Sequence, residues 1–306
     1  MLNSDSEGRL WVTDGGQPES SYRYAVSKIL VMEETPFQSL AIVDTPAYGK
    51  ALILDGNWQS CVVDEFLYHE PLVHPAMLLH GAPRRVAILG GGEGATLREV
   101  LRWKTVESVI MIDLDEEVVA ACRTHLPEMH QGAFEDPRAE VLTCDATEWL
   151  DSTDELFDVV ISDLSEPLED GPCYQLFTQE YYRQVQRVLS PHGFFTLQAG
   201  SVSPREITVF ARVANTLSTV FDRVWPYASF VPSFITPWGF LLASMQDAGN
   251  IPTPTSVDQS LSENTSGGFR MLDGEAFQGL FSTSAHIRKA IDSETTIYRL
   301  NNPPQI

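Results

Sequence analysis

Two carboxylic acids lie close together in the segment DLSEP, residues 163–167, where the strand-like run FDVVISDL ends. Because the carboxyl ends of strands in an open α/β sheet face the ligand crevice, we expect Asp163 and Glu166 to project into it. Such a pair suits an amine nucleophile: one acid can hold the cationic amine, and the other can accept the proton that the attacking nitrogen sheds. The structural alternative is that both acids only cap the turn before Pro167.

A glycine-rich segment, GGGEG over residues 90–94, follows the strand-like run RRVAILGG directly and opens a helix-like run. Gly90 and Gly92 would let the backbone turn tightly and approach a ligand closely. Glu93 inside this loop would repel a pyrophosphate or a carboxylate and attract a tail that carries an amine. The alternatives are that the loop is only a turn and that Glu93 points to solvent.

Acidic residues also end the next two strand-like runs. Asp113 lies nineteen positions after Gly94, where an acid can bind both ribose hydroxyls, although it could also cap the helix EEVVAAC. Asp145 and Ala146 follow the next strand, in the usual position for contacting an adenine. Together these strand ends predict a site for an adenosine-type co-substrate, and Glu93 favours one without a carboxylate, such as decarboxylated S-adenosylmethionine.

Three histidines raise the question of a metal site. His69, His74 and His80 are spaced by five and six residues, so they do not share one face of a helix. We therefore expect no bound metal and no prosthetic group.

The elements that position these residues change character along the chain. Residues 1–63 contain short apolar or alternating runs separated by Pro, Gly and Asp turns, which predicts a small antiparallel β domain. A helix should follow, with Asp64 as its cap and with Pro71 and Pro75 bending or interrupting it.

From residue 84 onward, Val/Ile/Leu-rich strands alternate with amphipathic helices. This alternation predicts an α/β domain over residues 64–306 with a parallel sheet that is covered on both faces. The final pair of strand-like runs, RVWPYASFVP and WGFLLAS, predicts a hairpin, and hence the mostly parallel seven-stranded sheet of the Rossmann-like class I methyltransferase fold. Residues 247–268 are rich in Pro, Ser, Thr and Asn and predict a surface loop.

Composition excludes several functional classes. The formal net charge of −22 argues against nucleic-acid binding, because phosphates must be met by Lys and Arg. The same charge either serves solubility or attracts a small polycation. We find no run of eighteen apolar residues and no secretory signal, and the four cysteines form no CxxC pair. We therefore expect a cytoplasmic protein without a membrane span.

With these residues in hand, the chain resembles the spermidine synthase family from about residue 22 to residue 298. The matching stretches are FQSLAIVDT, LILDGNWQS, DEFLYHEPLVHPA, GGGEGATLREVLRW, MIDLDEEVV and CDA. The later stretches GPCYQLFT and PSF-x-x-x-WGF look like those of thermospermine synthases. Ordinary spermidine synthases have a shorter loop in the first of these stretches and a tyrosine at the position of Phe234.

The resemblance implies roles for individual residues. Those that would contact decarboxylated S-adenosylmethionine, a co-substrate in this family, are Gln38, Glu93, Asp113, Asp145 and Ala146. Those implied on the polyamine side are Tyr68 and His69, with Gln59 a further candidate. Asp163 would be the proton acceptor, assisted by Glu166. The sequence departs from the family pattern at Glu166, where the family has aspartate, and at Glu93, where spermidine synthases usually have aspartate and thermospermine synthases have glutamate.

The implied activity is transfer of an aminopropyl group to a polyamine, with spermidine giving thermospermine and methylthioadenosine. Three alternatives stay open: a spermidine synthase that uses putrescine, a small-molecule methyltransferase, and a non-catalytic polyamine-binding homologue. We expect a homo-oligomer, either a dimer or a tetramer.

Overall fold

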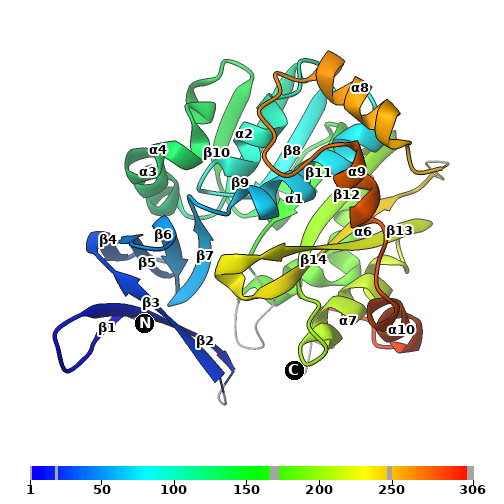
Figure 1. Cartoon of the computed structure of the whole chain (residues 1–306). Coiled ribbons are helices and arrows are strands. Elements are labelled where there is room, and N and C mark those ends of the chain that lie inside the picture. The colour runs from blue at the N-terminus through cyan, green and yellow to red at the C-terminus, as the bar shows by residue number, and fades with distance from the viewer. Residues whose placement is uncertain (1, 18–19, 166–171, 247–249, 302–306) are drawn as a thin grey trace.

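The computed structural model describes residues 2–17, 20–165, 172–246 and 250–301. An N-terminal part made of strands lies beside a larger part in which helices cover a twisted sheet (Figure 1). None of the helices in these ranges is long and apolar enough to cross a membrane.

The N-terminal part consists of two small antiparallel sheets within the described residues up to 61. The first contains β1 (Leu2–Ser4), β2 (Leu10–Gln17) and β3 (Ser20–Val26); the second contains β4 (Lys28–Glu34), β5 (Ser39–Thr45), β6 (Gly49–Leu54) and β7 (Asn57–Cys61). The small antiparallel β domain is thereby confirmed. The run RYAVSKILVMEE is divided at Ser27 between the two sheets.

The larger part contains, in the described residues, a seven-stranded sheet with the order β10-β9-β8-β11-β12-β14-β13. Its strands are β8 (Arg85–Gly90), β9 (Ser108–Asp113), β10 (Ala139–Thr143), β11 (Phe157–Asp163), β12 (Leu189–Ser201), β13 (Arg223–Val231) and β14 (Thr236–Ser244). Only β14 runs antiparallel to its neighbours, which confirms the mostly parallel α/β fold. The chain builds outward from β8 to β10 and then returns to β11 on the other side of β8, so the strand order reverses between β8 and β11. Ligands bind at such a switch point, outside the carboxyl ends of the strands.

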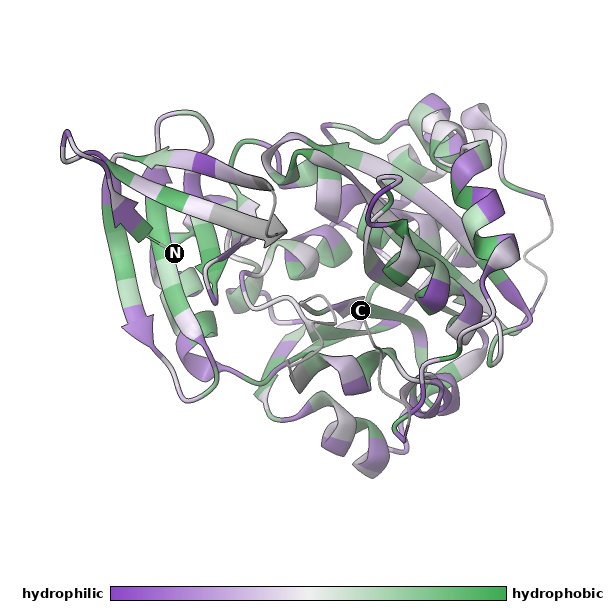
Figure 2. Cartoon of the chain, turned by 90° about the horizontal axis from the view of Figure 1, so that it is seen from below, coloured by the Kyte–Doolittle hydropathy of each residue, from purple (hydrophilic) through white to green (hydrophobic). Residues whose placement is uncertain are grey.

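Two hydrophobic clusters cover the two faces of this sheet. The helices on one face are α1 (Phe66–His80), α2 (Ala95–Leu101), α8 (Pro254–Asn264) and α9 (Gly274–Leu280); those on the other are α5 (Ala146–Ser152), α6 (Gln179–Arg187), α7 (Ile207–Leu217) and α10 (Ala285–Ser293). Figure 2 shows hydrophobic residues concentrated along the strands and hydrophilic residues on the outer helices. Between the two parts of the chain, α3 (Glu116–His125) and α4 (Pro127–His130) pack on the four-stranded sheet.

Helix α1 is not interrupted by its two prolines. Pro75 has no N–H to donate to the carbonyl of Pro71 four residues earlier. The hydroxyl of Tyr227 on β13 donates to that carbonyl instead, at 2.9 Å. The lost helical hydrogen bond is thus replaced by one that ties α1 to the sheet.

The expectation of a loop over residues 247–268 was wrong for its central part, which forms α8. Thr253 caps this helix by accepting a hydrogen bond from the Ser256 N–H, and Pro254 occupies its first turn. Val257 and Leu261, four residues apart, are buried on its inner face. Polar composition concealed this single apolar stripe.

Candidate active site

The glycine loop lies directly against the end of β11. Gly90 has a φ of +86°, and the Gly91 N–H donates to the carbonyl oxygen of Asp163 at 3.0 Å. A Cβ atom on Gly90 would lie only 2.2 Å from that oxygen. The loop therefore needs glycine here both for backbone conformation and for space.

Replacing Gly90 with alanine should destabilise the fold by about 2–4 kcal/mol, because positive-φ strain adds to a backbone clash. Gly132→Ala is a matched control: Gly132 has a φ of +83°, but its added Cβ would meet nothing within 4 Å. We expect the control to cost about 1 kcal/mol. Urea unfolding measures both changes, and equal values for the two variants would contradict the close approach.

The carboxylate of Asp163 is held by two hydroxyl groups at the end of β11. Tyr68 Oη donates to Oδ1 at 2.8 Å, and Thr96 Oγ1 donates to Oδ2 at 2.6 Å. Burial raises the pKa of Asp163 above its ordinary value, and the charge of His69 and these hydrogen bonds oppose the rise only in part. A fixed carboxylate with a raised pKa is suited to act as a general base.

His69 is completely buried beside this carboxylate, between two other acids. Its Nδ1 lies 3.0 Å from Glu65 Oε2, and its Nε2 lies 2.9 Å from Glu93 Oε1. Burial opposes charge on the ring, but these two carboxylates raise the pKa of His69 well above its ordinary value. Burial would likewise raise the pKa of Glu93, but His69 lowers it below its ordinary value. Glu93 is therefore a carboxylate within the glycine loop, and each ring nitrogen of His69 lies beside a carboxylate.

Asp113 lies at the end of β9, next to the glycine loop. A Cβ on Gly92 would lie 2.8 Å from Asp113 Oδ2, so the loop passes close to this carboxylate. Burial, together with the nearby carboxylates of Asp115 and Glu93, raises the pKa of Asp113 to about 6. This side chain is therefore ionised at neutral pH and becomes protonated in mildly acidic solution.

The cap of α3 is Asp115, not Asp113 as the alternative interpretation supposed. Asp115 Oδ1 accepts hydrogen bonds from the N–H groups of Glu117 and Val118, at the start of α3. Its other oxygen accepts from Thr35 Oγ1 at 2.6 Å and from Gln38 Nε2 at 3.0 Å. Asp115 thus ties the N-terminal part of the chain, including Gln38, to the end of β9.

Asp145 follows β10 and caps α5, which begins at Ala146. The Asp145 carboxylate accepts from the Thr147 N–H at 2.7 Å and from the Glu148 N–H at 3.1 Å. Both Asp145 and Ala146 are partly exposed at the same edge of the sheet as Asp113 and Asp163.

Aromatic side chains line the other side of Asp163; we call Tyr68, Phe234 and Trp238 the aromatic wall. Phe234 meets Tyr68 edge-on with ring centroids 5.9 Å apart, and it meets Trp238 edge-on at 4.7 Å. Trp238 Nε1 donates to Gln198 Oε1 at 3.1 Å, which fixes the indole. We did not assign Trp238 to the site from the sequence, although the WGF motif contains it.

The turn that carries Phe234 is held by hydrogen bonds to its neighbour Ser233. Asp64, which we expected to cap α1, instead accepts from the Ser233 N–H at 2.7 Å and from Ser233 Oγ at 2.9 Å. Tyr24 Oη, in the first N-terminal sheet, donates to the Ser233 carbonyl at 2.6 Å. Ile235 follows with a φ of +59°, a conformation that is strained for a β-branched residue. These contacts fix a turn that is unfavourable by itself.

Comparison with known families assigns the chain to one of them. The description "Spermine/spermidine synthase domain" matches residues 65–251, more than half of the chain, and "Spermidine synthase tetramerisation domain" matches residues 10–61. The chain belongs to the spermine/spermidine synthase family.

Relatives in this family match over nearly the whole chain. A polyamine aminopropyltransferase of Synechococcus sp. is 52% identical, with 97% of each chain covered. A thermospermine synthase of Arabidopsis thaliana is 35% identical, with 98% of this chain and 88% of that protein covered. Among solved structures, a spermidine synthase in complex with the transition state analogue AdoDATO has a TM-score of 0.86 at 27% identity, with 96% of this chain and 98% of that chain covered.

Two further residues that the family resemblance singled out are Gln59 and Glu166. The Gln59 amide donates to the carbonyl of Asn57 on its own strand at 3.3 Å. Glu166 lies outside the described residues, so its role remains a prediction.

His74 and His80 have separate partners, Glu99 at 2.9 Å and Asp158 at 3.7 Å. Within the described ranges, no three His, Cys, Asp or Glu side chains are grouped to hold a metal.

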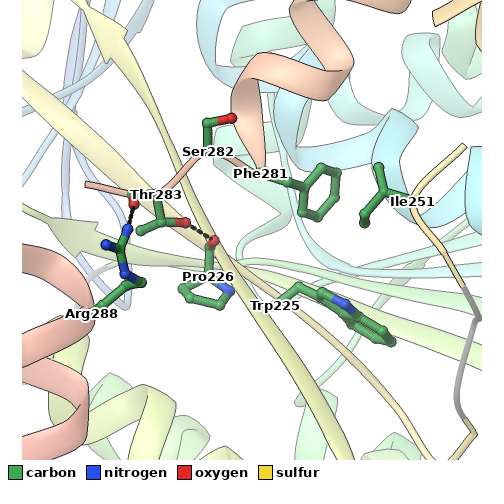
Figure 3. Close-up of a pocket in the computed structure, with 7 residues that line it drawn as sticks. All are labelled: Trp225, Pro226, Ile251, Phe281, Ser282, Thr283 and Arg288. Carbon is green, nitrogen blue, oxygen red and sulfur yellow. Dashed lines mark hydrogen bonds between the residues drawn. The ribbon is translucent and has the colours of Figure 1, made fainter. Parts of the chain in front are cut away.

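A hollow of about 420 Å³ lies elsewhere, at the edge strand β13. It is lined by Trp225, Pro226, Ile251, Phe281, Ser282, Thr283 and Arg288 (Figure 3). None of these residues belongs to the aromatic wall or to the acids at the strand ends, Asp113, Asp145 and Asp163. The hollow is therefore separate from the candidate active site.

Proposed function

We propose that the protein transfers the aminopropyl group of decarboxylated S-adenosylmethionine to spermidine, giving thermospermine and methylthioadenosine. The observation that carries this proposal is the placement of Asp163. Its carboxylate lies at the switch point between β8 and β11, and it is oriented by Tyr68 and Thr96 next to Glu93. A base and an amine-binding acid thereby share one site.

The acids on the β8–β10 side suit the adenosine end and the amine tail. Asp113 would bind the ribose hydroxyls, Asp145 and Ala146 would contact the adenine, and Gln38 would approach from the N-terminal part. Glu93 would accept the amine of the tail and would repel the carboxylate of S-adenosylmethionine. Support comes from the related spermidine synthase structure, whose ligand is the transition state analogue AdoDATO.

The proposed reaction is an in-line displacement. A neutral nitrogen of the acceptor attacks the carbon next to the sulfonium, the carbon–sulfur bond breaks with its electron pair left on sulfur, and methylthioadenosine leaves uncharged. The proton of the attacking nitrogen passes to Asp163. Because the co-substrate is already activated, the protein mainly supplies alignment and a base.

The acceptor side favours a long, cationic and partly apolar molecule. The aromatic wall offers ring faces to the methylene chain and to the cationic groups of a polyamine. The acidic charge of the whole chain attracts such a polycation. Glu166 would hold an acceptor amine, and Tyr68 and Gln59 would help to position the chain.

With spermidine in excess, we expect thermospermine as the main product, exceeding spermine, and slower turnover of putrescine. Putrescine is shorter and reaches less of the aromatic wall. Chromatography of the products from each acceptor with decarboxylated S-adenosylmethionine measures this preference, with a reaction lacking acceptor as the control. Faster turnover of putrescine would assign the protein to the spermidine synthases.

That second function has support of its own, because the solved structures that align with the chain include spermidine synthases, among them one from Thermotoga maritima with a TM-score of 0.85. Aminopropyl transfer and the base are common to both functions, and only the acceptor differs.

We also propose a homo-oligomer, supported by the match of residues 10–61 to the tetramerisation domain. All four cysteines, Cys61, Cys122, Cys144 and Cys173, are free thiols. Free thiols fit a reducing compartment, and we propose the cytoplasm.

A further inference from the structure

The oxygens next to the two ring nitrogens of His69 indicate its protonation state. Nδ1 lies 2.8 Å from the backbone carbonyl oxygen of Glu65 and 3.0 Å from Glu65 Oε2. A carbonyl oxygen can only accept a hydrogen bond, and so can an oxygen of an ionised carboxylate. Nε2 lies 2.9 Å from Glu93 Oε1, a second carboxylate oxygen. A neutral imidazole would turn a lone pair toward one of these oxygens, whereas an imidazolium presents an N–H group to the acid on each side. The contact at Nδ1 is a hydrogen bond, and the contact at Nε2 is an ion pair without hydrogen-bond geometry. His69 is therefore a buried cation between two acids.

His74, on the same helix, shows the opposite pattern. Its Nδ1 accepts a hydrogen bond from Trp103 Nε1, which can only donate, at 3.1 Å. Its Nε2 lies 2.9 Å from Glu99 Oε2, so this ring lies between one acid and one N–H donor. The two buried histidines thus differ in that His69 has a second acid where His74 has the indole of Trp103.

Glu65 is itself fixed from behind. Arg98 Nη2 lies 2.8 Å from Glu65 Oε2, and the same guanidinium contacts Glu99 at 2.7 Å. Both acids and the arginine are almost fully buried. Glu65 therefore remains a carboxylate that contacts His69. It belongs neither to the acids at the strand ends nor to the aromatic wall.

We propose that Glu65 is a positioning residue for the aminopropyl transfer, which holds His69 as an imidazolium so that Glu93 and Asp163 can both remain carboxylates in one small site. This inference rests on the proposed function for the role of Asp163. Glu65 acts only through His69. Without the imidazolium, the acid that binds the amine tail and the acid that accepts the proton would repel each other.

The charged and titratable groups around His69 come from every element packed against it. They are Glu65 and Tyr68 at the start of α1, Glu93 in the glycine loop, Asp163 at the end of β11, and, through Glu65, Arg98 on α2 and Arg270 at 3.9 Å from Glu65 Oε1. The positive charge of His69 lowers the pKa of Asp163 against the effect of burial, which has the direction that the proposal requires.

The first test is the pH dependence of kcat for Glu65→Gln. A protonated Asp163 cannot accept a proton, so the rate falls as the pH drops through its pKa. Without Glu65, His69 loses one of its two anionic partners and becomes neutral, and the pKa of Asp163 rises. We call this fall of kcat at low pH the acid limb of the profile. In Glu65→Gln we expect the acid limb to move to higher pH by about one unit, while kcat at pH values above it changes only a few-fold.

Glu70→Gln is the matched control. Glu70 lies on the same helix, is equally buried, and accepts hydrogen bonds from the N–H groups of Arg270, Met271 and Leu272 rather than from His69. The Glu70→Gln variant should have a lower free energy of unfolding, and the acid limb of its kcat profile should stay at the same pH. A uniform fall in the rate of Glu65→Gln, with the limb unmoved, would show a purely structural role and overturn the proposal.

A double variant tests whether the effect passes through His69. His69→Gln should shift the limb upward by itself, and adding Glu65→Gln should shift it no further. Two independent, additive shifts would mean that Glu65 acts on Asp163 directly.

A third measurement does not depend on activity. The ¹⁵N NMR signals of the His69 ring, assigned by their loss in His69→Gln, should show both nitrogens protonated at pH 7 in the unaltered protein and deprotonation at lower pH in Glu65→Gln. An unchanged titration would overturn the proposal. A correct titration in a protein that lacks aminopropyltransferase activity would instead show that the proposed function has failed.

Discussion

Asp163→Asn is expected to lower kcat by about 10²–10⁴-fold while leaving the fold and co-substrate binding intact. The amines of the acceptor are mostly protonated at neutral pH, so one proton must leave before or during the attack. An amide has nearly the same shape as the carboxylate but cannot accept that proton. Tyr68 and Thr96 contact different oxygens of Asp163, so in the variant one hydroxyl can donate to the amide oxygen while the oxygen of the other accepts from the amide NH2, which keeps the side chain in place.

The pH dependence separates loss of the base from general damage. Burial raises the pKa of Asp163, so the acid limb of the unaltered enzyme should lie above the ordinary range of an aspartate, and Asp163→Asn should lose this limb. Asp158→Asn is the matched control, because Asp158 lies at the other end of β11 and accepts from the N–H groups of Arg84 and Arg85. If Asp163→Asn keeps more than about a tenth of the rate, the base is another residue, and Glu166 is the next candidate.

The second large effect concerns Glu93. The unaltered protein should bind decarboxylated S-adenosylmethionine at least about tenfold more tightly than S-adenosylmethionine, a difference of roughly 1.4 kcal/mol. In Glu93→Gln, affinity for the decarboxylated form should fall by about 10²-fold, because the amine of its tail loses a buried carboxylate partner. Affinity for S-adenosylmethionine should change less or improve, so the preference should disappear.

Titration calorimetry with both molecules measures these affinities. Glu117→Gln removes the same charge from an exposed position on α3 and should leave both affinities almost unchanged. Equal affinities in the unaltered protein would remove the main argument against a methyltransferase.

The sequence was sufficient to predict the two-part organisation and the sheet, because continuous apolar strands separated by amphipathic helices leave few other folds. It also placed Asp113, Asp145 and Asp163 at one edge, since carboxyl ends of parallel strands converge there. The structure confirms the fold. The roles of these acids stay predictions until the variants are measured.

Contacts between distant segments were beyond local patterns. Asp64 and Ser233 are 169 residues apart, so nothing near Asp64 showed that it holds a turn rather than a helix start. Asp113 and Asp115 are both reasonable caps by position, and only the backbone path at the end of β9 decides between them. The charge of His69 depends on acids from two different segments, Glu65 and Glu93, and could not be seen in its spacing from other histidines.

The N-terminal part contacts the candidate site at two places: Gln38 donates to Asp115, near Asp113, and Tyr24 donates to the turn that carries Phe234. A change in the N-terminal part that moves Tyr24 or Gln38 should therefore move residues of the candidate site. For the evolution of the family, this makes the junction near residue 63 a poor place for recombination. A chimera that joined the first part of one relative to the second part of another would need a donor at position 24, a donor at position 38 and an acceptor at position 115, so we expect these positions to change together.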